Sequence, residues 1–146
     1  MAEEKLKNKN LVVIGKRKSA VAKATIKQGK GKIDIKINGK PIEFFPELQQ
    51  LELQEPIIIA QDVFESNKDK LNFEIRVNVV GGGLSSRVAA SRLAIARAIV
   101  EFTKSEKLKK AYIAYDRHLI IADTRRKEAC KPGDSKARAR RQTSYR

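Results

Sequence analysis

Three cations stand side by side near the start of the chain, in the segment Gly15-Lys16-Arg17-Lys18-Ser19. Apolar segments that resemble strands flank this loop on both sides. Cations and free backbone amides in a tight turn are the groups that hold a phosphate. The segment therefore predicts a phosphate contact by Lys16, Arg17 and Lys18, and the alternative is a charged hairpin that meets only solvent.

A second candidate lies where three glycines, Gly81 to Gly83, precede a predicted helix. Glycines allow a ligand to approach the backbone closely, and a helix N-terminus presents free N–H groups and partial positive charge. Arg87 falls in the first turn, where a cation is unfavourable unless an anion is bound nearby. An anion contact and a flexible connection are equal alternatives here. Arg92, inside the apolar side of this helix, either extends its guanidinium to solvent or contacts an anion.

The C-terminal segment alternates small and basic residues, in Lys136-Ala137-Arg138-Ala139-Arg140-Arg141. Small side chains let the backbone come close to a narrow RNA groove, while guanidinium groups fork onto phosphates or stack on bases. We expect this stretch to bind RNA, and a nonspecific solubilising tail is the alternative.

The composition also favours an acidic partner. The 146 residues include 32 Lys and Arg against 17 Asp and Glu, a net charge of +15, and nucleic acid is the commonest partner of such a chain. Residues 117–146 hold ten basic and three acidic residues, whereas residues 41–67 hold six acidic residues and no lysine or arginine. We expect that acidic segment to face away from RNA, toward solvent or a basic neighbouring protein.

Residues that enzymes use are scarce. His118 is the only histidine and Cys130 the only cysteine, so the chain can form neither a four-ligand zinc site of its own nor an internal disulfide. Gly15-Lys16 is not part of a P-loop, because Asn10 stands where the first glycine of that motif belongs. We therefore expect no enzyme activity, no cofactor and no metal. The single cysteine and the lack of a long apolar run or a secretory signal favour a cytoplasmic protein away from membranes.

Hydrophobic periodicity outlines the elements that must position these cations. It predicts strands over residues 11–14, 20–27, 32–37 and 71–79, with a hairpin turn at 28–31 and another at Asn38-Gly39. Pro41, Pro46 and Pro56 suit the first turns of short helices. Ser85 and Ser86 are N-cap candidates for a helix that runs to about Lys104. Leu84, Val88, Ile95, Ile99 and Phe102 share its apolar face, which Ala89, Leu93, Ala96 and Val100 widen.

These elements indicate an α+β fold, with an open sheet and helices on one face. Apolar periodicity stops after Asp123. We therefore expect a globular RNA-binding body over residues 1–122 and an extended basic tail over residues 123–146, which orders only against a partner.

The same segments carry a resemblance to a known family. The stretches GKRKSAVAKATIKQGKGKIDIKINGKPIEFF and GGGLSSRVAASRLAIARAI resemble the opening and the triglycine-helix motif of the small-subunit ribosomal protein 9 family. The match is completed by Tyr115-Asp116-Arg117, the segment ADTRR at residues 122–126 and the ending ARARRQTSYR. The first and the last of these three are similar to the archaeal and eukaryotic branch of the family. The family motif usually has Gly-Gln where this chain has Ser86-Arg87, which favours a phosphate contact by Arg87.

The resemblance implies a four-stranded sheet with helices on one face, like the second domain of small-subunit ribosomal protein 5, with a left-handed crossover. It also implies a structural role in the head of the small ribosomal subunit, with rRNA, P-site tRNA and neighbouring ribosomal proteins as partners. Ser144, Tyr145 and Arg146 are then expected at the anticodon stem-loop of the P-site tRNA. The rRNA contacts are expected from Lys16, Arg17, Lys18, Arg87, Arg92, Arg97, Arg125, Arg126, Lys127, Lys131, Lys136, Arg138, Arg140 and Arg141.

Two other hypotheses remain open from the residues themselves. A free architectural protein that binds RNA or DNA would have the same composition. An enzyme with a basic substrate cleft is the more distant alternative, because no base and nucleophile pair is visible in the sequence.

Overall fold

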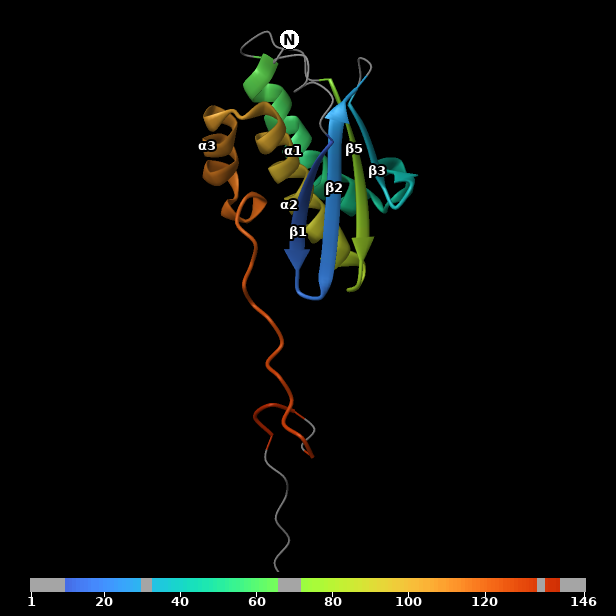
Figure 1. Cartoon of the computed structure of the whole chain (residues 1–146), viewed down its shortest axis with the longest axis vertical. Helices are drawn as coiled ribbons and strands as arrows, with labels where there is room; N and C mark the ends of the chain where they lie inside the picture. The colour runs from blue at the N-terminus through green and yellow to red at the C-terminus, as the bar shows by residue number, and fades with distance from the viewer. Residues whose placement is uncertain (1–9, 30–32, 66–71, 134–135, 140–146) are drawn as a thin grey trace, which may run out of the picture.

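A mixed β-sheet covered by helices on one face forms the body of the protein (Figure 1). The computed structural model describes residues 10–29, 33–65, 72–133 and 136–139. Within these ranges the strands are β1 (Leu11–Arg17), β2 (Ala20–Gln28), β3 (Asp34–Ile37), β4 (Lys40–Pro41) and β5 (Phe73–Val80). The α-helices there are α1 (Glu47–Glu65), α2 (Leu84–Thr103) and α3 (Glu106–Tyr115), and the 3-10 helices are η2 (Ile42–Phe44) and η3 (Arg117–Leu119).

The strand order is β1-β2-β5-β3-β4, so the α+β class is confirmed and the expected four strands become five in the described residues. The additional strand, β4, has only two residues and pairs with β3 through the Asn38-Gly39 turn. Asn38 and Gly39 both have positive φ angles, of 49° and 79°. This is the backbone conformation of the hairpin turn that the Asn-Gly pair predicts.

The predicted hairpin between β2 and β3 is wrong. β5 lies between these strands, antiparallel to β2 and parallel to β3. The alternation of β5 is confirmed, because Phe73, Ile75, Val77 and Val79 are all buried on one face of the sheet, and β2 and β3 pair with its backbone on either side. Alternation specifies which face of a strand is buried, but it does not specify the neighbouring strand.

α1 makes the connection from β3 to its parallel neighbour β5. In Figure 1 both strands run downward, α1 lies behind the sheet, and β5 lies to the left of β3, which gives the connection a left-handed sense. Right-handed crossovers are the rule for parallel neighbours. The left-handed sense is the one that the family resemblance implies.

The proline at position 56 lies inside α1, so the prediction that it starts a short helix is wrong. A proline within a helix removes one backbone hydrogen bond. Tertiary contacts hold this one in place, since Pro56 is fully buried and its carbonyl oxygen accepts a 2.5 Å hydrogen bond from the Tyr112 hydroxyl of α3. Pro41 and Pro46 do precede helices, η2 and α1.

α2 begins at Leu84 with Gly83 as its N-cap, so Ser85 and Ser86 are not the caps that the sequence predicts. Gly81 and Gly82, with φ angles of 76° and 67°, turn the chain directly from β5 into the helix. The helix ends as expected, at a left-handed Lys104. Leu84 and Phe102, at the two ends of the helix, are exposed at 52% and 36%, although the Phe102 ring still makes an edge-to-face contact with Phe73 of β5.

Small residues let α2 lie close to the sheet. Gly15 of β1 and Ala20, Ala22 and Ala24 of β2 are buried against a helix face that includes Ala90, Ala94 and Ala98. A Cβ atom on Gly15 would overlap the Ala90 carbonyl oxygen and would lie only 2.7 Å from the Ala94 backbone nitrogen. The helix backbone itself therefore occupies the space that a side chain at position 15 would need.

The chain beyond η3 leaves the body. Residues 122–131 form neither helix nor strand, and this segment runs away from the sheet on the side of the β1–β2 turn (Figure 1). The boundary between a body of residues 1–122 and a tail of residues 123–146 stays a prediction. Across the described ranges, no helix combines the length and the apolarity that crossing a membrane requires.

We predict that Gly15→Ala lowers the free energy of unfolding by about 1–3 kcal/mol or more, because the new methyl group meets backbone atoms of α2. Urea unfolding of the isolated protein measures the change. Gly83→Ser is the matched control, since a Cβ there meets nothing within 4 Å and serine is a favoured N-cap. An unchanged midpoint for Gly15→Ala would contradict the close approach of α2.

We also predict a pH-dependent effect at Tyr112. Burial raises the pKa of this phenol above its ordinary value, so the unfolded chain loses the proton at a lower pH than the folded chain does. The free energy of unfolding should therefore fall above pH ~10, by up to about 1.4 kcal/mol per pH unit from this group. Tyr112→Phe should cost about 1–3 kcal/mol near pH 8, and the difference between the two proteins should shrink as the pH rises.

Unfolding curves at several pH values test this prediction at Tyr112. Tyr115→Phe serves as a control near pH 8, because it removes the hydroxyl of a residue that is 60% exposed. A difference between Tyr112→Phe and the unsubstituted protein that stays constant from pH 8 to 11 would contradict the proposed burial effect.

Candidate nucleic-acid interface

Six of the predicted RNA-binding residues converge where the tail leaves the body. We call these residues the tail-exit cluster: Lys16 and Arg17 of β1, Arg92 and Arg97 of α2, and Arg125 and Arg126 of the following chain. Five of them line two adjoining depressions of about 230 and 320 Å³, which share Lys16 and Asp123. The sequence did not predict this convergence, because β1 and the tail are far apart in the chain.

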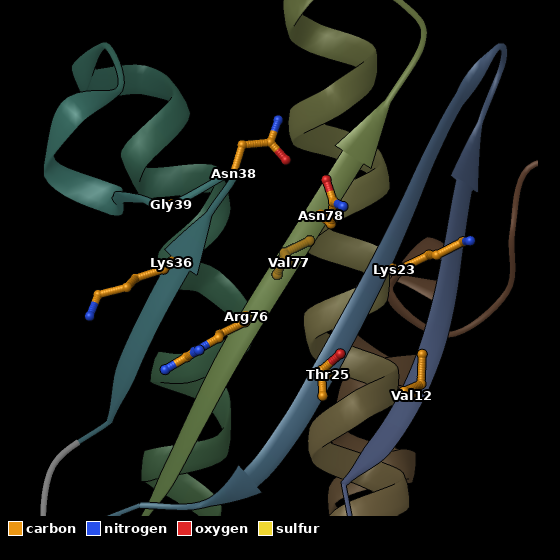
Figure 2. A pocket seen from close by; sticks show the side chains of 9 residues that line it. All are labelled: Val12, Lys23, Thr25, Lys36, Asn38, Gly39, Arg76, Val77 and Asn78. Atoms are coloured by element: carbon orange, nitrogen blue, oxygen red, sulfur yellow. The ribbon is translucent and has the colours of Figure 1, made fainter.

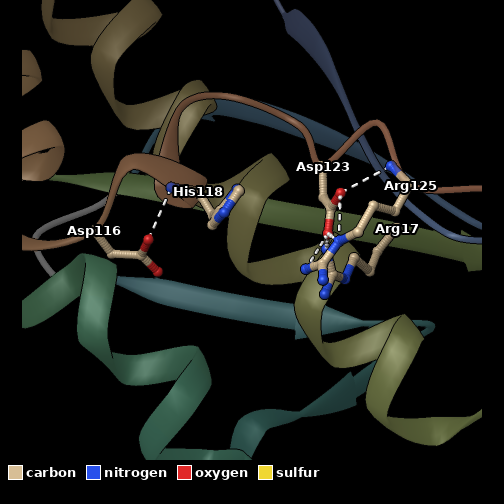
Figure 3. Close-up of polar contacts among 5 residues, drawn as sticks. All are labelled: Arg17, Asp116, His118, Asp123 and Arg125. Atoms are coloured by element: carbon tan, nitrogen blue, oxygen red, sulfur yellow. Dashed lines mark hydrogen bonds and ion pairs between the residues drawn. The ribbon is translucent and has the colours of Figure 1, made fainter.

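Asp123 is the anion at the centre of the tail-exit cluster. Its side chain is only 7% exposed, and it forms an ion pair with Arg17 and a 2.8 Å ion pair with Arg125 Nη2 (Figure 3). The backbone N–H of Arg125 also donates to Asp123 Oδ1, at 2.8 Å. One buried carboxylate therefore attaches the first tail residues to the end of β1.

Arg97 makes a second attachment. Its Nε donates to the carbonyl oxygen of Ile120 at 2.7 Å, and its Nη1 donates to the carbonyl oxygen of Ile14 at 3.0 Å. These bonds join α2, β1 and the segment just before the tail. Because a guanidinium presents several donors in one plane, it can hold two backbone segments in a fixed relation.

Arg92 contacts anions, and these belong to the chain itself. Its guanidinium forms ion pairs with Glu55 of α1 at 2.5 Å and with Asp116, which precedes η3, at 3.0 Å. Asp116 also accepts a hydrogen bond from the backbone N–H of His118, at 2.8 Å (Figure 3). An rRNA contact by Arg92 stays a prediction, and it would compete with two carboxylates.

Two further predicted residues lie at the end of the sheet toward which the tail runs. Lys18 stands in the β1–β2 turn with a φ of 52°. Arg87 folds back over the triglycine segment, where its Nε donates to the carbonyl oxygens of Gly81 and Gly82 at 3.0 and 3.2 Å. The carbonyl oxygens of the triglycine segment thus offset the unfavourable position of this cation in the first turn of α2.

Beyond Asp123, the basic residues of the described part of the tail face solvent. Lys127, Lys131 and Lys136 are exposed, and Arg138 forms a 3.0 Å ion pair with Glu128 in which both side chains are exposed. Exposed pairs of this kind contribute little to stability. The remaining predicted contacts, Arg140, Arg141, Ser144, Tyr145 and Arg146, lie outside the described residues.

The structure adds an open face of the sheet that the sequence reasoning missed. A groove of about 670 Å³ crosses this face, with Lys23, Lys36 and Arg76 among its lining residues (Figure 2). Strand register places Thr25, Arg76 and Lys36 in one row across three strands. The outward positions of the alternating strands carried the signal, because Lys23 and Lys36 both fall on the exposed face.

Acidic residues partly neutralise the positive charge of this open face. Glu74 pairs with Arg76 at 2.7 Å and with Lys27 at 3.3 Å, and Asp34 pairs with Lys36 at 3.0 Å. The hydrogen bond from Arg76, followed by that from Lys27, lowers the pKa of Glu74 below its ordinary value. Because these ion pairs are exposed, a phosphate can compete for the cations.

No catalytic arrangement is found in the residues that the structure describes. Cys130 is exposed in the tail, while His118 lies in η3 beside the tail-exit cluster. Among the described residues, no group of three or more histidine, cysteine or carboxylate side chains is arranged to hold a metal ion. The arrangement offers fixed cations and an exposed basic segment, which suit binding of a polyanion.

We predict that Asp123→Asn lowers the free energy of unfolding by about 1–3 kcal/mol, because the variant leaves Arg17 without its carboxylate. Hydrogen exchange at the backbone amide of Arg125 should also accelerate, since that amide donates to Asp123. Glu128→Gln is the control, because its ion pair with Arg138 is exposed and should change neither quantity measurably. Unchanged exchange at Arg125 in Asp123→Asn would show that this carboxylate does not fix the tail exit.

Comparison with known proteins assigns the family. The model of the family "Ribosomal protein S9/S16" matches residues 15–146. Small ribosomal subunit protein uS9 of Methanococcus maripaludis strain C7 is 43% identical over 136 residues, which are 91% of this chain and 96% of the relative. The uS9 protein of Methanothrix thermoacetophila is 44% identical over 133 residues, with coverages of 90% and 95%. This chain therefore belongs to the ribosomal protein S9/S16 family.

Proposed function

We propose that this protein is a structural constituent of the small ribosomal subunit in the cytoplasm, not an enzyme, and that it binds small-subunit rRNA. In the finer form of this proposal, the body binds rRNA in the head of the subunit and the tail runs to the P site. There Ser144, Tyr145 and Arg146 meet the anticodon stem-loop of the tRNA.

One observation carries the proposal: the family match begins at β1 and continues through residue 146. It therefore includes the tail-exit cluster and the whole basic tail, and the relatives that match over most of their length are small-subunit proteins. The geometry supports the same function. Arg97 and Asp123 hold the start of the tail against β1 and α2, so a rigid body directs a basic segment away from itself.

The proposed mechanism is electrostatic. Lysines such as Lys16, Lys18 and Lys127 are exposed near the tail exit, where phosphates of folded rRNA would meet them. Such phosphate contacts fix position and orientation without reading sequence. The same property suits Arg146, because a ribosome must hold every P-site tRNA by features that all tRNAs share.

Sedimentation of a native lysate through a sucrose gradient tests the coarser proposal. After a high-salt wash, we expect the protein to comigrate with the small subunit. Recovery only at the top of the gradient, even at low salt, would overturn the ribosomal assignment. It would then point to a free nucleic-acid-binding protein, whose bound RNA could be sequenced.

Arg146→Ala tests the finer proposal. Small subunits that carry this variant should bind P-site tRNA roughly tenfold more weakly, because a charge-assisted contact to a phosphate is lost. Arg146→Lys should retain part of the affinity, and Arg138→Ala serves as a control of equal charge within the tail. Filter binding of tRNA to salt-washed subunits gives the affinities, and equal affinity for Arg146→Ala and the unsubstituted protein would refute the tRNA contact.

A further inference from the structure

The outer surface of α1 and η2 exposes apolar side chains that the body does not use. Phe44, Leu48, Leu51 and Ile58 are 70%, 72%, 55% and 49% exposed. We call these four residues the α1 outer stripe. Leu48 and Leu51 are three residues apart and Leu51 and Ile58 seven, which places them on one side of the helix. The opposite side is buried against the body, through Leu53, Pro56 and Ala60.

α1 is therefore apolar on two sides, whereas a helix that meets solvent on its outer side normally has a polar face there. Single exposed apolar residues need no explanation, but a grouped set marks an interaction surface. The sequence left two alternatives for what the acidic segment of residues 41–67 faces, solvent or a basic neighbouring protein. The grouping of exposed apolar side chains favours a protein partner.

The acidic residues around the α1 outer stripe indicate which class of partner could bind there. Residues 41–67 contain six acidic residues and no lysine or arginine, in a chain with a net charge of +15. Glu43 and Glu47, next to Phe44 and Leu48, are exposed. Carboxylates repel phosphates, so this surface disfavours RNA and attracts cations.

One contact within the chain illustrates this preference. The ammonium group of Lys40, in β4, lies 4.5 Å from the centre of the Phe44 ring. A cation over an aromatic face is attracted by the ring electrons. The exposed Phe44 ring of η2 thus already accommodates a lysine of this chain.

We infer that the α1 outer stripe binds a basic segment of another protein. Aliphatic side chains of the partner would cover Leu48, Leu51 and Ile58, and its lysines or arginines would lie near Glu43 and Glu47. The inference rests on the proposed function, because the partner is expected within the assembled small subunit. Cationic residues then lie at the tail exit, on the open sheet face and on α3, whereas η2 and α1 present an acidic and apolar surface.

Site-specific photocrosslinking in assembled subunits tests the inference. A photoreactive amino acid replaces Leu48, and in a second variant Leu51, in the full chain; both sites are exposed, so the body should fold. A matched probe replaces Val12 on the open sheet face, which is 58% exposed. We expect an adduct at Leu48 or Leu51 that resists ribonuclease, disappears with protease, and contains a partner peptide with net positive charge.

Charge reversal provides the second measurement. Glu43→Lys combined with Glu47→Lys should lower the yield of that adduct by roughly threefold or more. Glu101→Lys, an exposed reversal on α2, is the control and should leave the yield unchanged. An equal yield in the double variant would overturn the role of the acidic rim.

The outcomes separate the inference from the proposed function. A chain that does not sediment with the small subunit overturns the proposed function, and the inference falls with it. A chain that sediments with the subunit but crosslinks to rRNA, to an acidic peptide or to nothing at both Leu48 and Leu51 overturns only the inference. A basic protein adduct supports both.

Discussion

The close approach of α2 to the first two strands is the constraint on which the rest of the body depends. Gly15 leaves room for the backbone at Ala90 and Ala94, and a row of alanines on β2 continues this shallow surface. Larger side chains would separate helix and sheet and open voids, which interiors do not tolerate. Because α2 lies this close to the sheet, Arg97 reaches the carbonyl oxygen of Ile14. The packing of small residues therefore also sets the position of this arginine.

That arginine belongs to a wider arrangement in which the chain binds its own cations. Arg17 and Arg125 meet Asp123, Arg92 bridges Glu55 and Asp116, and Arg97 holds two backbone segments. The Asp123 carboxylate is the buried charge among them, with a side chain that is 7% exposed, and it requires partners because an unpaired buried charge is costly. Arg17, Arg92 and Arg97 thus hold segments of the body together, while exposed residues such as Lys16, Arg126 and Lys127 present charge outward.

The distribution of charge follows from these assignments. Exposed cations lie on the open sheet face, at the tail exit, along the tail and on α3, while the exposed acidic residues of η2 and α1 flank apolar side chains. In the proposed function and the further inference, this distribution lets one small body engage RNA and protein on different sides, which suits a component of a ribonucleoprotein.

The sequence alone determined the α+β class, the faces of the strands, the Asn38-Gly39 turn, the extent of α2 and the family, because these follow from local periodicity, turn chemistry and motifs. It did not determine the place of β5 between β2 and β3, the helical environment of Pro56 or the N-cap at Gly83. It also missed the meeting of Arg17, Arg97 and Asp123. These depend on contacts between segments far apart in the chain, and only the tertiary structure brings such segments together.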